Sequence, residues 1–256
     1  MTDTALAPLA RRLISLLDLT SLNASDDEVS IRSFVRGAST EAGNVAAVCT
    51  WQRLVPAARA GLRGSGIAVA AVANFPAGDL GSERAASECA AAIEAGASEI
   101  DVVFPYREFL AGNPRAGGEL VRACRAACGD RALLKVILET GQLGSSERIR
   151  QAARVAIDAG AHFLKTSTGK TEPGATLAAA EALLDTIVEA AGRGRSVGLK
   201  VSGGVRTLEQ ARSYLELYES RQGEGSAQPS NFRIGASSLT QELLATAMVR
   251  SGAQAR

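Results

Sequence analysis

Short runs of β-branched and other apolar residues recur along the chain at intervals of about 30 residues. Their length of four to eight residues, and the turn-forming residues between them, are typical of β-strands. Eight strands are predicted, at residues 15–20, 45–50, 67–74, 99–104, 133–139, 163–167, 197–201 and 232–235. Several runs, such as residues 69–73, are apolar on both faces, which indicates strands that are buried on both sides.

Stretches rich in Ala, Arg and Glu separate these runs, and they predict helices at 83–95, 118–127, 146–159, 176–191 and 208–219. Alternation of strands with helices implies parallel strands, and eight such units favour an α/β protein with a closed (β/α)8 TIM barrel. An open, doubly wound sheet is the alternative, but the GxGxxG motif that often follows its first strand is absent. We expect a single domain over 1–256, with an N-terminal helix at 1–12 and a disordered tail at 251–256.

The charge and hydropathy of the chain favour a small molecule as its partner. A formal net charge of +1 is spread along the 256 residues, so no nucleic-acid or anionic-membrane surface is indicated. The N-terminus does not resemble a signal peptide, and no apolar run approaches the roughly 20 residues of a membrane span. We therefore expect a cytoplasmic protein.

Cysteine and histidine usage argues against a metal or disulfide framework. The four cysteines, Cys49, Cys89, Cys124 and Cys128, are scattered over different predicted elements, and His162 is the only histidine. We expect chemistry without a metal or a cofactor.

Lysine is rare in this sequence, which makes its positions informative. The 28 basic residues comprise 24 Arg and four Lys, at positions 135, 165, 170 and 200. An amine can lose its proton and attack carbon, whereas a guanidinium cannot, so these positions are candidates for a reactive amine. Codon bias that left four lysines by chance is the alternative.

Charged residues interrupt the apolar strands, and five of them are candidates for chemistry: Asp18, Asp101, Lys135, Lys165 and Lys200. The active site of such a barrel lies at the carboxyl ends of its strands. Lys165 and Lys200 belong to consecutive strands, about 4.8 Å apart, and burial together with a second cation lowers the pKa of an amine. The free amine would attack a carbonyl to form an iminium, which allows a neighbouring carbon-carbon bond to break. The alternative is a buried ion-pair network that only stabilises the fold.

Asp101 is the best candidate for proton transfer in this reaction, through a water molecule. Lys135 would keep Asp101 ionised. Two carboxylates and three amines leave an excess of positive charge, which favours an anionic substrate.

Glycine and serine clusters follow the last strands, where barrels of this type usually bind phosphate. Gly203-Gly204 follows the seventh predicted strand, residues 235–238 follow the eighth, and residues 168–170 follow the sixth. Each cluster alone is more often a plain turn. Their shared position favours a phosphate site.

Six segments in sequence order resemble the deoxyribose-phosphate aldolase family. They are LDLT (17–20), EIDVV (99–103), LKVILETG (134–141), FLKTSTG (163–169), KVSGGVRT (200–207) and RIGASS (233–238). The resemblance implies a class I aldolase without a metal, which interconverts 2-deoxyribose 5-phosphate with acetaldehyde and glyceraldehyde 3-phosphate. It also implies a homodimer.

The resemblance assigns roles to residues that match the family motifs. Lys165 would form the Schiff base, Lys200 would lower its pKa, and Asp101 would transfer protons. The pocket would be lined by Asp18, Thr20, Cys49, Lys135 and Thr168. The phosphate would bind near Gly169, Lys170, Gly203, Gly204, Gly235, Ser237 and Ser238.

One departure from the family concerns the C-terminus, where some relatives carry a tyrosine that helps proton transfer. The last tyrosine here is Tyr218, so turnover is expected to differ. Two other functions stay open: another Schiff-base aldolase that acts on a different sugar phosphate, and a catalytically silent barrel that only binds sugar phosphate.

Overall fold

The computed structural model describes residues 3–79 and 81–249, which fold as a closed barrel surrounded by helices. Parallel strands pair in the order β1-β10-β9-β8-β7-β6-β5-β4, and β4 returns to β1. The strands are β1 (Leu17–Thr20), β4 (Ala47–Thr50), β5 (Ala68–Ala73), β6 (Glu99–Val103), β7 (Leu133–Ile137), β8 (Phe163–Lys165), β9 (Gly198–Ser202) and β10 (Phe232–Ala236). Each overlaps one predicted strand, so the (β/α)8 barrel is confirmed. The expected tail at 251–256 lies outside the described residues.

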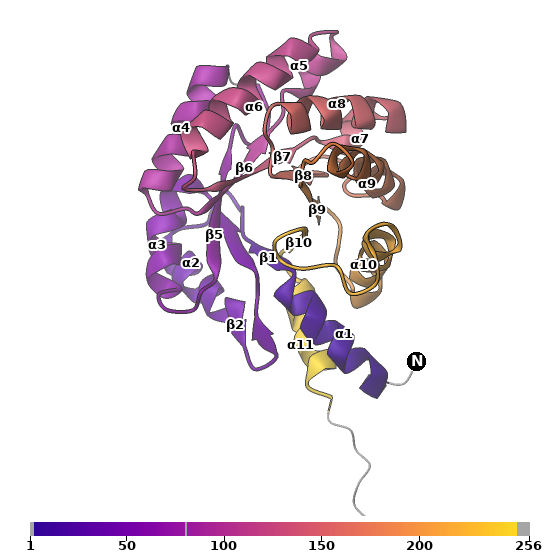
Figure 1. The fold of residues 1–256 in the computed structure, drawn as a ribbon. Coiled ribbons are helices and arrows are strands. Elements are labelled where there is room, and N and C mark those ends of the chain that lie inside the picture. Colours follow the sequence, from indigo (N-terminus) through magenta and orange to yellow (C-terminus); the bar gives the residue numbers. More distant parts are fainter. Residues whose placement is uncertain (1–2, 80, 250–256) are drawn as a thin grey trace, which may run out of the picture.

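The helices form a ring outside the strands (Figure 1). Five of them lie within four residues of their predicted ends: α4 (Ser82–Glu94), α6 (Pro114–Cys128), α8 (Ser146–Asp158), α9 (Leu177–Ala191) and α10 (Leu208–Gln222). The others are α1 (Asp3–Ser15), α2 (Glu28–Phe34), α3 (Val55–Gly61), α5 (Tyr106–Leu110), α7 (Thr140–Leu143) and α11 (Leu239–Ala247). Two 3-10 turns, η1 (Val35–Ala38) and η2 (Gln52–Leu54), and a small hairpin, β2 (Ser39–Thr40) with β3 (Gly43–Asn44), complete the fold. Helices α1 and α11 pack side by side, so the two ends of the described chain meet (Figure 1).

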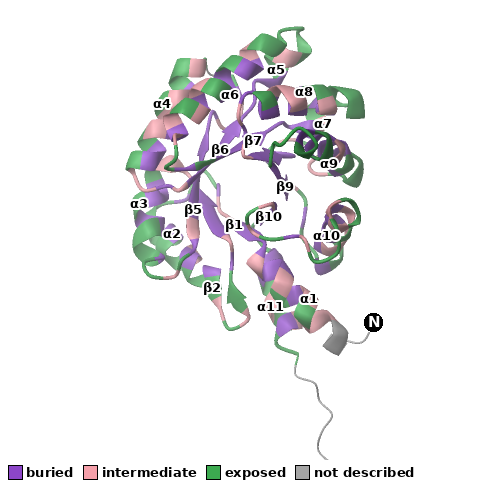
Figure 2. Cartoon of the chain, viewed as in Figure 1, coloured by how far each residue is buried: buried purple, intermediate pink, exposed green. Residues whose placement is uncertain are grey.

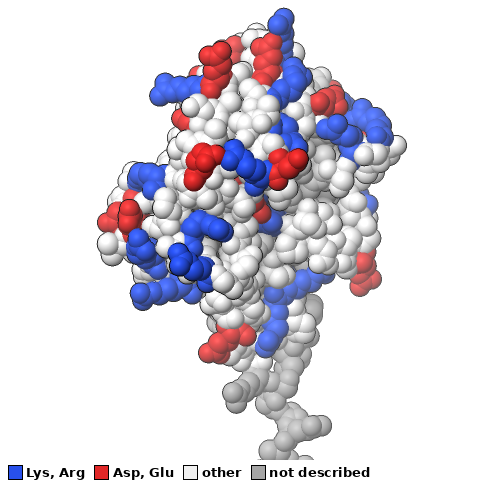
Figure 3. All heavy atoms as spheres, turned by 60° about the vertical axis from the view of Figure 1, so that its left-hand side comes forward, with Lys and Arg blue, Asp and Glu red and all other residues white. Residues whose placement is uncertain are grey.

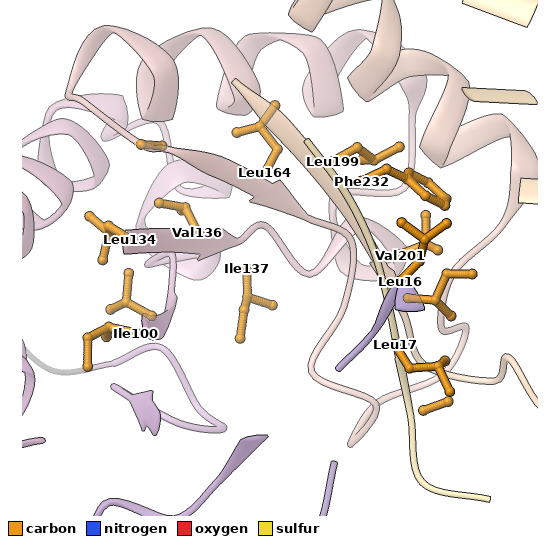
Figure 4. Close-up of a cluster of buried hydrophobic side chains, with 14 of the residues drawn as sticks. Leu16, Leu17, Ile100, Leu134, Val136, Ile137, Leu164, Leu199, Val201 and Phe232 are labelled. Carbon is orange, nitrogen blue, oxygen red and sulfur yellow. The ribbon is translucent and has the colours of Figure 1, made fainter. Parts of the chain in front are cut away.

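Side chains along each strand alternate between the helical layer and the barrel interior. On β7, Leu134 and Val136 join the apolar core beneath the helices, whereas Lys135 between them reaches charged groups on other strands. Leu164 on β8 and Leu199 on β9 belong to the same core, and Figure 4 shows some of its members. The barrel strands are mostly buried, while the outward faces of the helices are exposed (Figure 2). This alternation points one set of side chains at the barrel axis.

The barrel interior is apolar on one side and closed at its lower end. A small cluster of Cys49, Ala70 and Val72 lines the side formed by β4 and β5. Near the amino ends of the strands, the ring of Phe163 fills the space beside Gly198, where an added Cβ would lie 2.4 Å from a ring carbon. Charged side chains occupy much of the remaining interior, and a pocket lies at the carboxyl ends of the strands.

Charges of both signs occur on the surface. Acidic and basic side chains are mixed over the face shown in Figure 3. In the described part of the chain, none of the helices combines the length and apolar character needed to cross a membrane.

Candidate active site

Seven ionisable side chains from six strands fill the barrel interior, and we call this group the charge stack. It consists of Asp18, Glu99, Asp101, Lys135, Lys165, Lys200 and Arg233. Each side chain is no more than 6% exposed. Ions buried this deeply must be compensated by partners of opposite charge, so the contacts within the stack decide which groups are ionised.

Asp101 lies at the centre of the charge stack. Its Oδ1 accepts a hydrogen bond from Lys135 Nζ at 2.9 Å. Its Oδ2 accepts from Lys165 Nζ at 2.8 Å and from Lys200 Nζ at 2.7 Å. Lys165 and Lys200 are also direct partners in the register of β8 and β9. The two amines therefore lie close together, as expected, and both donate a hydrogen bond to the same carboxylate oxygen.

Asp18 and Glu99 extend the stack toward the closed end of the barrel. Lys200 Nζ lies 2.5 Å from Asp18 Oδ2, and Lys135 Nζ lies 2.5 Å from Glu99 Oε2. Arg233 bridges the two carboxylates, with Nη1 at 2.6 Å from Asp18 Oδ1 and Nη2 at 2.9 Å from Glu99 Oε1. The Arg233 guanidinium also lies 5.8 Å from the centre of the Phe163 ring.

Glu99 and Arg233 are functional candidates that the sequence analysis missed. Glu99 stands two residues before Asp101 on β6, and residues two apart on a strand share a face. Arg233 is the register partner of Lys200 on β10. The alternation of side chains along the strand could have placed Glu99 inside the barrel, beside Asp101. The excess of one cation still holds, because Glu99 and Arg233 add one charge of each sign.

The surroundings shift the pKa values of Lys165 and Lys200 in opposite directions. Burial lowers the pKa of Lys165, Asp101 opposes this, and the adjacent Lys200 lowers the pKa further. Burial also acts to lower the pKa of Lys200, but Asp101 and Asp18 together raise it above the ordinary value. Lys165 is therefore the amine that loses its proton more readily.

The remaining groups around Asp101 support an ionised carboxylate. Burial alone would raise the pKa of Asp101, but Lys135, Lys165 and Lys200 hold it well below its ordinary value. Cys49 Sγ lies 3.9 Å from Asp101 Oδ2, and burial followed by the charge of Asp101 raises the pKa of this thiol to about 11. Cys49 is thus a neutral neighbour of the charge stack.

A pocket of about 230 Å³ lies above the stack, at the carboxyl ends of the strands. Lys165 is the member of the charge stack that lines it, so its amine lies between the pocket and Asp101. The lining includes nine further residues expected from the sequence: Thr20, Thr168, Gly169, Lys170, Gly203, Gly204, Gly235, Ser237 and Ser238. It also includes residues to which the sequence analysis assigned no individual role: Ser21, Leu22, Asn23, Ser202, Val205, Arg206 and Ala236. The expected lining residues Asp18, Cys49 and Lys135 lie beneath the pocket, within or beside the stack, rather than on its surface.

Hydrogen bonds to the buried residue Glu139 hold the loop after β8 in place. The sequence analysis predicted Glu139 as part of a strand. Glu139 instead adopts a left-handed backbone, with φ of 51° and ψ of 58°, just beyond β7. Its carboxylate accepts from Thr168 N at 3.1 Å and from Thr168 Oγ1 at 2.5 Å. Lys170 N in turn donates to Thr168 Oγ1 at 3.0 Å, and Lys170 Nζ donates to Leu22 O at 2.7 Å. The loop is thereby held across the pocket to the segment after β1.

Glycines allow the loops around the pocket to approach one another. Gly203 has a φ of +89°, and an added Cβ would lie 3.3 Å from Gly174 Cα and 3.2 Å from Ser167 Cβ. At Gly235, an added Cβ would lie 3.1 Å from Lys200 Cε, so the absence of a side chain there leaves room for Lys200. Ser238 is the N-cap of α11 but makes no side-chain cap hydrogen bond, which leaves its hydroxyl available to a ligand.

The chain matches the family described as DeoC/LacD family aldolase over residues 12–240. Similar solved structures include two proteins provisionally identified as deoxyribose-phosphate aldolases. The one from Toxoplasma gondii ME49 shares 22% sequence identity, with 99% of each chain covered and a TM-score of 0.90. The one from Coccidioides immitis shares 28% identity, over 92% of this chain and 87% of that one, with a TM-score of 0.79. A deoxyribose phosphate aldolase from Aeropyrum pernix, described as having a unique tetrameric structure, shares 26% identity over 93% of this chain and 91% of its own, with a TM-score of 0.74.

Proposed function

Because the chain belongs to the DeoC/LacD family of aldolases, we propose that it reversibly cleaves 2-deoxy-D-ribose 5-phosphate into acetaldehyde and D-glyceraldehyde 3-phosphate. The reaction would proceed through a Schiff base on Lys165. One observation carries the proposal: the amine of Lys165 stands at the base of the pocket, 2.8 Å from Asp101, with Lys200 donating to the same oxygen. The likeness to a deoxyribose phosphate aldolase from Aeropyrum pernix supports the choice of substrate.

In the first step, the free amine of Lys165 attacks the aldehyde carbon, C1, of the open-chain sugar. The carbinolamine that forms loses water and gives an iminium. The positive charge of the iminium develops on Nζ, close to Oδ2 of Asp101, so a fixed carboxylate stabilises the intermediate. The barrel supplies this carboxylate already oriented.

In the second step, the C2–C3 bond of the sugar breaks. A base removes the proton of the C3 hydroxyl, a carbonyl forms at C3, and the electrons of the broken bond pass into the iminium to give an enamine. Glyceraldehyde 3-phosphate leaves. Protonation of the enamine carbon and hydrolysis by water then release acetaldehyde and restore the amine. Asp101 lies below the lining of the pocket, so it would exchange these protons with the substrate through a water molecule.

The phosphate would bind at the opposite end of the pocket from Lys165. Gly203 and Gly204 offer backbone N–H groups without a side chain in the way, and Ser238 stands at the start of α11. Lys170 and Arg206 supply positive charge in the same lining. The arrangement favours a dianion bound several atoms away from the reacting carbonyl.

Borohydride trapping tests the Schiff base. The folded protein is incubated with acetaldehyde and sodium borohydride, and the modified peptide is identified by mass spectrometry. We expect an N-ethyl group on Lys165. If the folded protein gains no adduct at this residue, the catalytic proposal is wrong and a barrel that only binds sugar phosphate is favoured. Comparing the cleavage of deoxyribose 5-phosphate with that of ketose phosphates then distinguishes this activity from that of another Schiff-base aldolase.

The proposal extends to a homodimer, as the family resemblance implies, and to a location in the cytoplasm. The relative from Aeropyrum pernix is described as tetrameric, so the two assemblies must be distinguished by experiment. Light scattering on the purified protein measures the mass in solution and decides between them.

A further inference from the structure

The charge stack balances only when one of its cations gives up a proton. It contains three carboxylates, on Asp18, Glu99 and Asp101, and four basic groups, on three lysines and Arg233. A net charge in a space this well buried is strongly unfavourable. With one amine neutral, three negative charges meet three positive charges.

The contacts show which amine is left with the weakest compensation. Lys135 lies within 4 Å of all three carboxylates, and Lys200 and Arg233 each contact two of them. Lys165 contacts only Asp101, through an oxygen that it shares with Lys200. Lys165 is therefore the group whose ammonium form gains least from the stack.

Glu99 and Arg233 lie away from the pocket, and their contacts in the stack are with groups other than Lys165. Each of them nevertheless changes the charge total by one. We propose that Glu99 and Arg233 are positioning residues that fix the proton count of the charge stack and thereby keep Lys165 as the free amine. The inference rests on the proposed Schiff-base function of Lys165.

The described elements around Lys165 do not supply a fourth carboxylate that would pair with the fourth basic group of the stack. The contributions of the strands are Asp18 from β1, Cys49 from β4, Glu99 and Asp101 from β6, Lys135 from β7, Lys200 from β9 and Arg233 from β10. The interior positions of β5 are Ala70 and Val72. Above Lys165, the described pocket lining carries cations at Lys170 and Arg206 and no carboxylate. Glu139, a further buried carboxylate close to the pocket, is bonded to the N–H and hydroxyl of Thr168. Within the described chain, the ion pairs that set the balance at Lys165 are thus those of the seven members of the stack.

Removal of a cation and removal of an anion from the stack test the proposal, because they should shift the pKa of Lys165 in opposite directions. Arg233→Met removes a cation, so three carboxylates face three lysines and Lys165 keeps its proton to higher pH. Glu99→Gln removes an anion and favours loss of the proton from Lys165 at lower pH. The readout is the rate of acetaldehyde trapping at Lys165 with cyanoborohydride, measured by mass spectrometry across a pH series. We expect the midpoint of the pH profile to rise by about one unit or more in Arg233→Met and to fall in Glu99→Gln.

Three further variants separate charge from packing. The double variant Glu99→Gln/Arg233→Met removes one charge of each sign and should return the midpoint toward that of the wild type. Arg233→Lys keeps the charge and should leave the midpoint close to the wild-type value. Arg195→Met removes a cation whose guanidinium donates to Ile157 O outside the stack, so it should leave the profile unchanged.

The possible results are distinct. If Arg233→Met does not fold, the double variant must still show a higher midpoint than Glu99→Gln alone. Midpoints that do not move, or that move in the same direction in both single variants, overturn the inference while the Schiff base itself stands. Failure of the wild-type protein to be trapped at Lys165 overturns both this inference and the proposed function.

Discussion

The ε-amino groups of Lys165 and Lys200 reach the same carboxylate oxygen, Oδ2 of Asp101, at 2.8 and 2.7 Å. Two amines that share one oxygen cannot both be compensated fully as ammonium ions. The second carboxylate beside Lys200, Asp18 at 2.5 Å, decides which of them keeps its proton. Lys200, which contacts two carboxylates, therefore stays a cation, whereas Lys165, which contacts one, becomes the nucleophile.

Replacement of Lys165 by arginine should abolish turnover while preserving the fold. The charge next to Asp101 survives, but guanidinium cannot form an iminium. We expect kcat for deoxyribose 5-phosphate to fall on the order of 10³-fold or more, with no borohydride adduct at this residue. The thermal unfolding midpoint is the control. Residual activity near that of the wild type would contradict the role of Lys165.

Replacement of Lys200 by methionine should move the reaction to higher pH. The positive charge of Lys200 acts to lower the pKa of Lys165, so its removal raises that pKa and reduces the free amine present at neutral pH. The rate of Schiff-base formation below the new midpoint should fall about tenfold for each pH unit of the shift. A pH series of trapping rates measures this. An unchanged midpoint would show that Lys200 acts only by packing.

Replacement of Asp101 by asparagine should separate the two chemical steps. The amide cannot accept the proton that bond cleavage releases, so kcat should fall by about 10²- to 10⁴-fold. Trapping of acetaldehyde at Lys165 needs no carbon-carbon cleavage and should persist. Steady-state kinetics and mass spectrometry on the same sample test both statements, and loss of both in a folded variant would instead assign Asp101 to formation of the Schiff base.

Replacement of Glu139 by glutamine should weaken binding of the phosphorylated substrate. The carboxylate holds both the N–H and the hydroxyl of Thr168, and a neutral amide would weaken the loop that carries Lys170. We expect KM for deoxyribose 5-phosphate to rise about tenfold, equivalent to roughly 1.4 kcal/mol, close to the lower end of the usual range for a hydrogen bond to a charged group. Trapping of acetaldehyde, which has no phosphate, should keep its wild-type rate. Thr168→Val removes only the hydroxyl and should show a smaller effect of the same kind.

Acid should destabilise the barrel through its buried aspartates. The three lysines hold the folded-state pKa of Asp101 well below the ordinary value of 3.8, against the effect of burial. As the pH falls past 3.8, the unfolded chain takes up protons first, so the stability that the ionised carboxylate contributes is lost progressively. The free energy of unfolding from urea titrations should be nearly constant with respect to this group above about pH 5 and should decrease below pH 4. A flat profile down to pH 3 would contradict the ionised state of the stack.

The barrel was predictable because its signal repeats. Eight apolar runs with helices between them leave few other architectures, and Lys165 and Lys200 follow once the strands are placed side by side. The sequence could not show that Arg233 reaches across the barrel to Glu99, since this contact joins residues 134 positions apart. It also could not show that Glu139 leaves β7 in a left-handed conformation and turns its carboxylate toward Thr168. Local pattern thus predicts strands and faces, whereas ion pairing depends on the curvature of the closed sheet.

The contact between Arg233 and Asp18 crosses the seam at which β10 pairs with β1. Synthesis produces Asp18 well before Arg233, which lies 215 positions further along the chain. A nascent chain that has not yet reached β10 therefore lacks both the closing strand and the cation that bridges two of its acidic groups. Catalytic competence should therefore await the synthesis of β10, although Lys165 itself is made earlier.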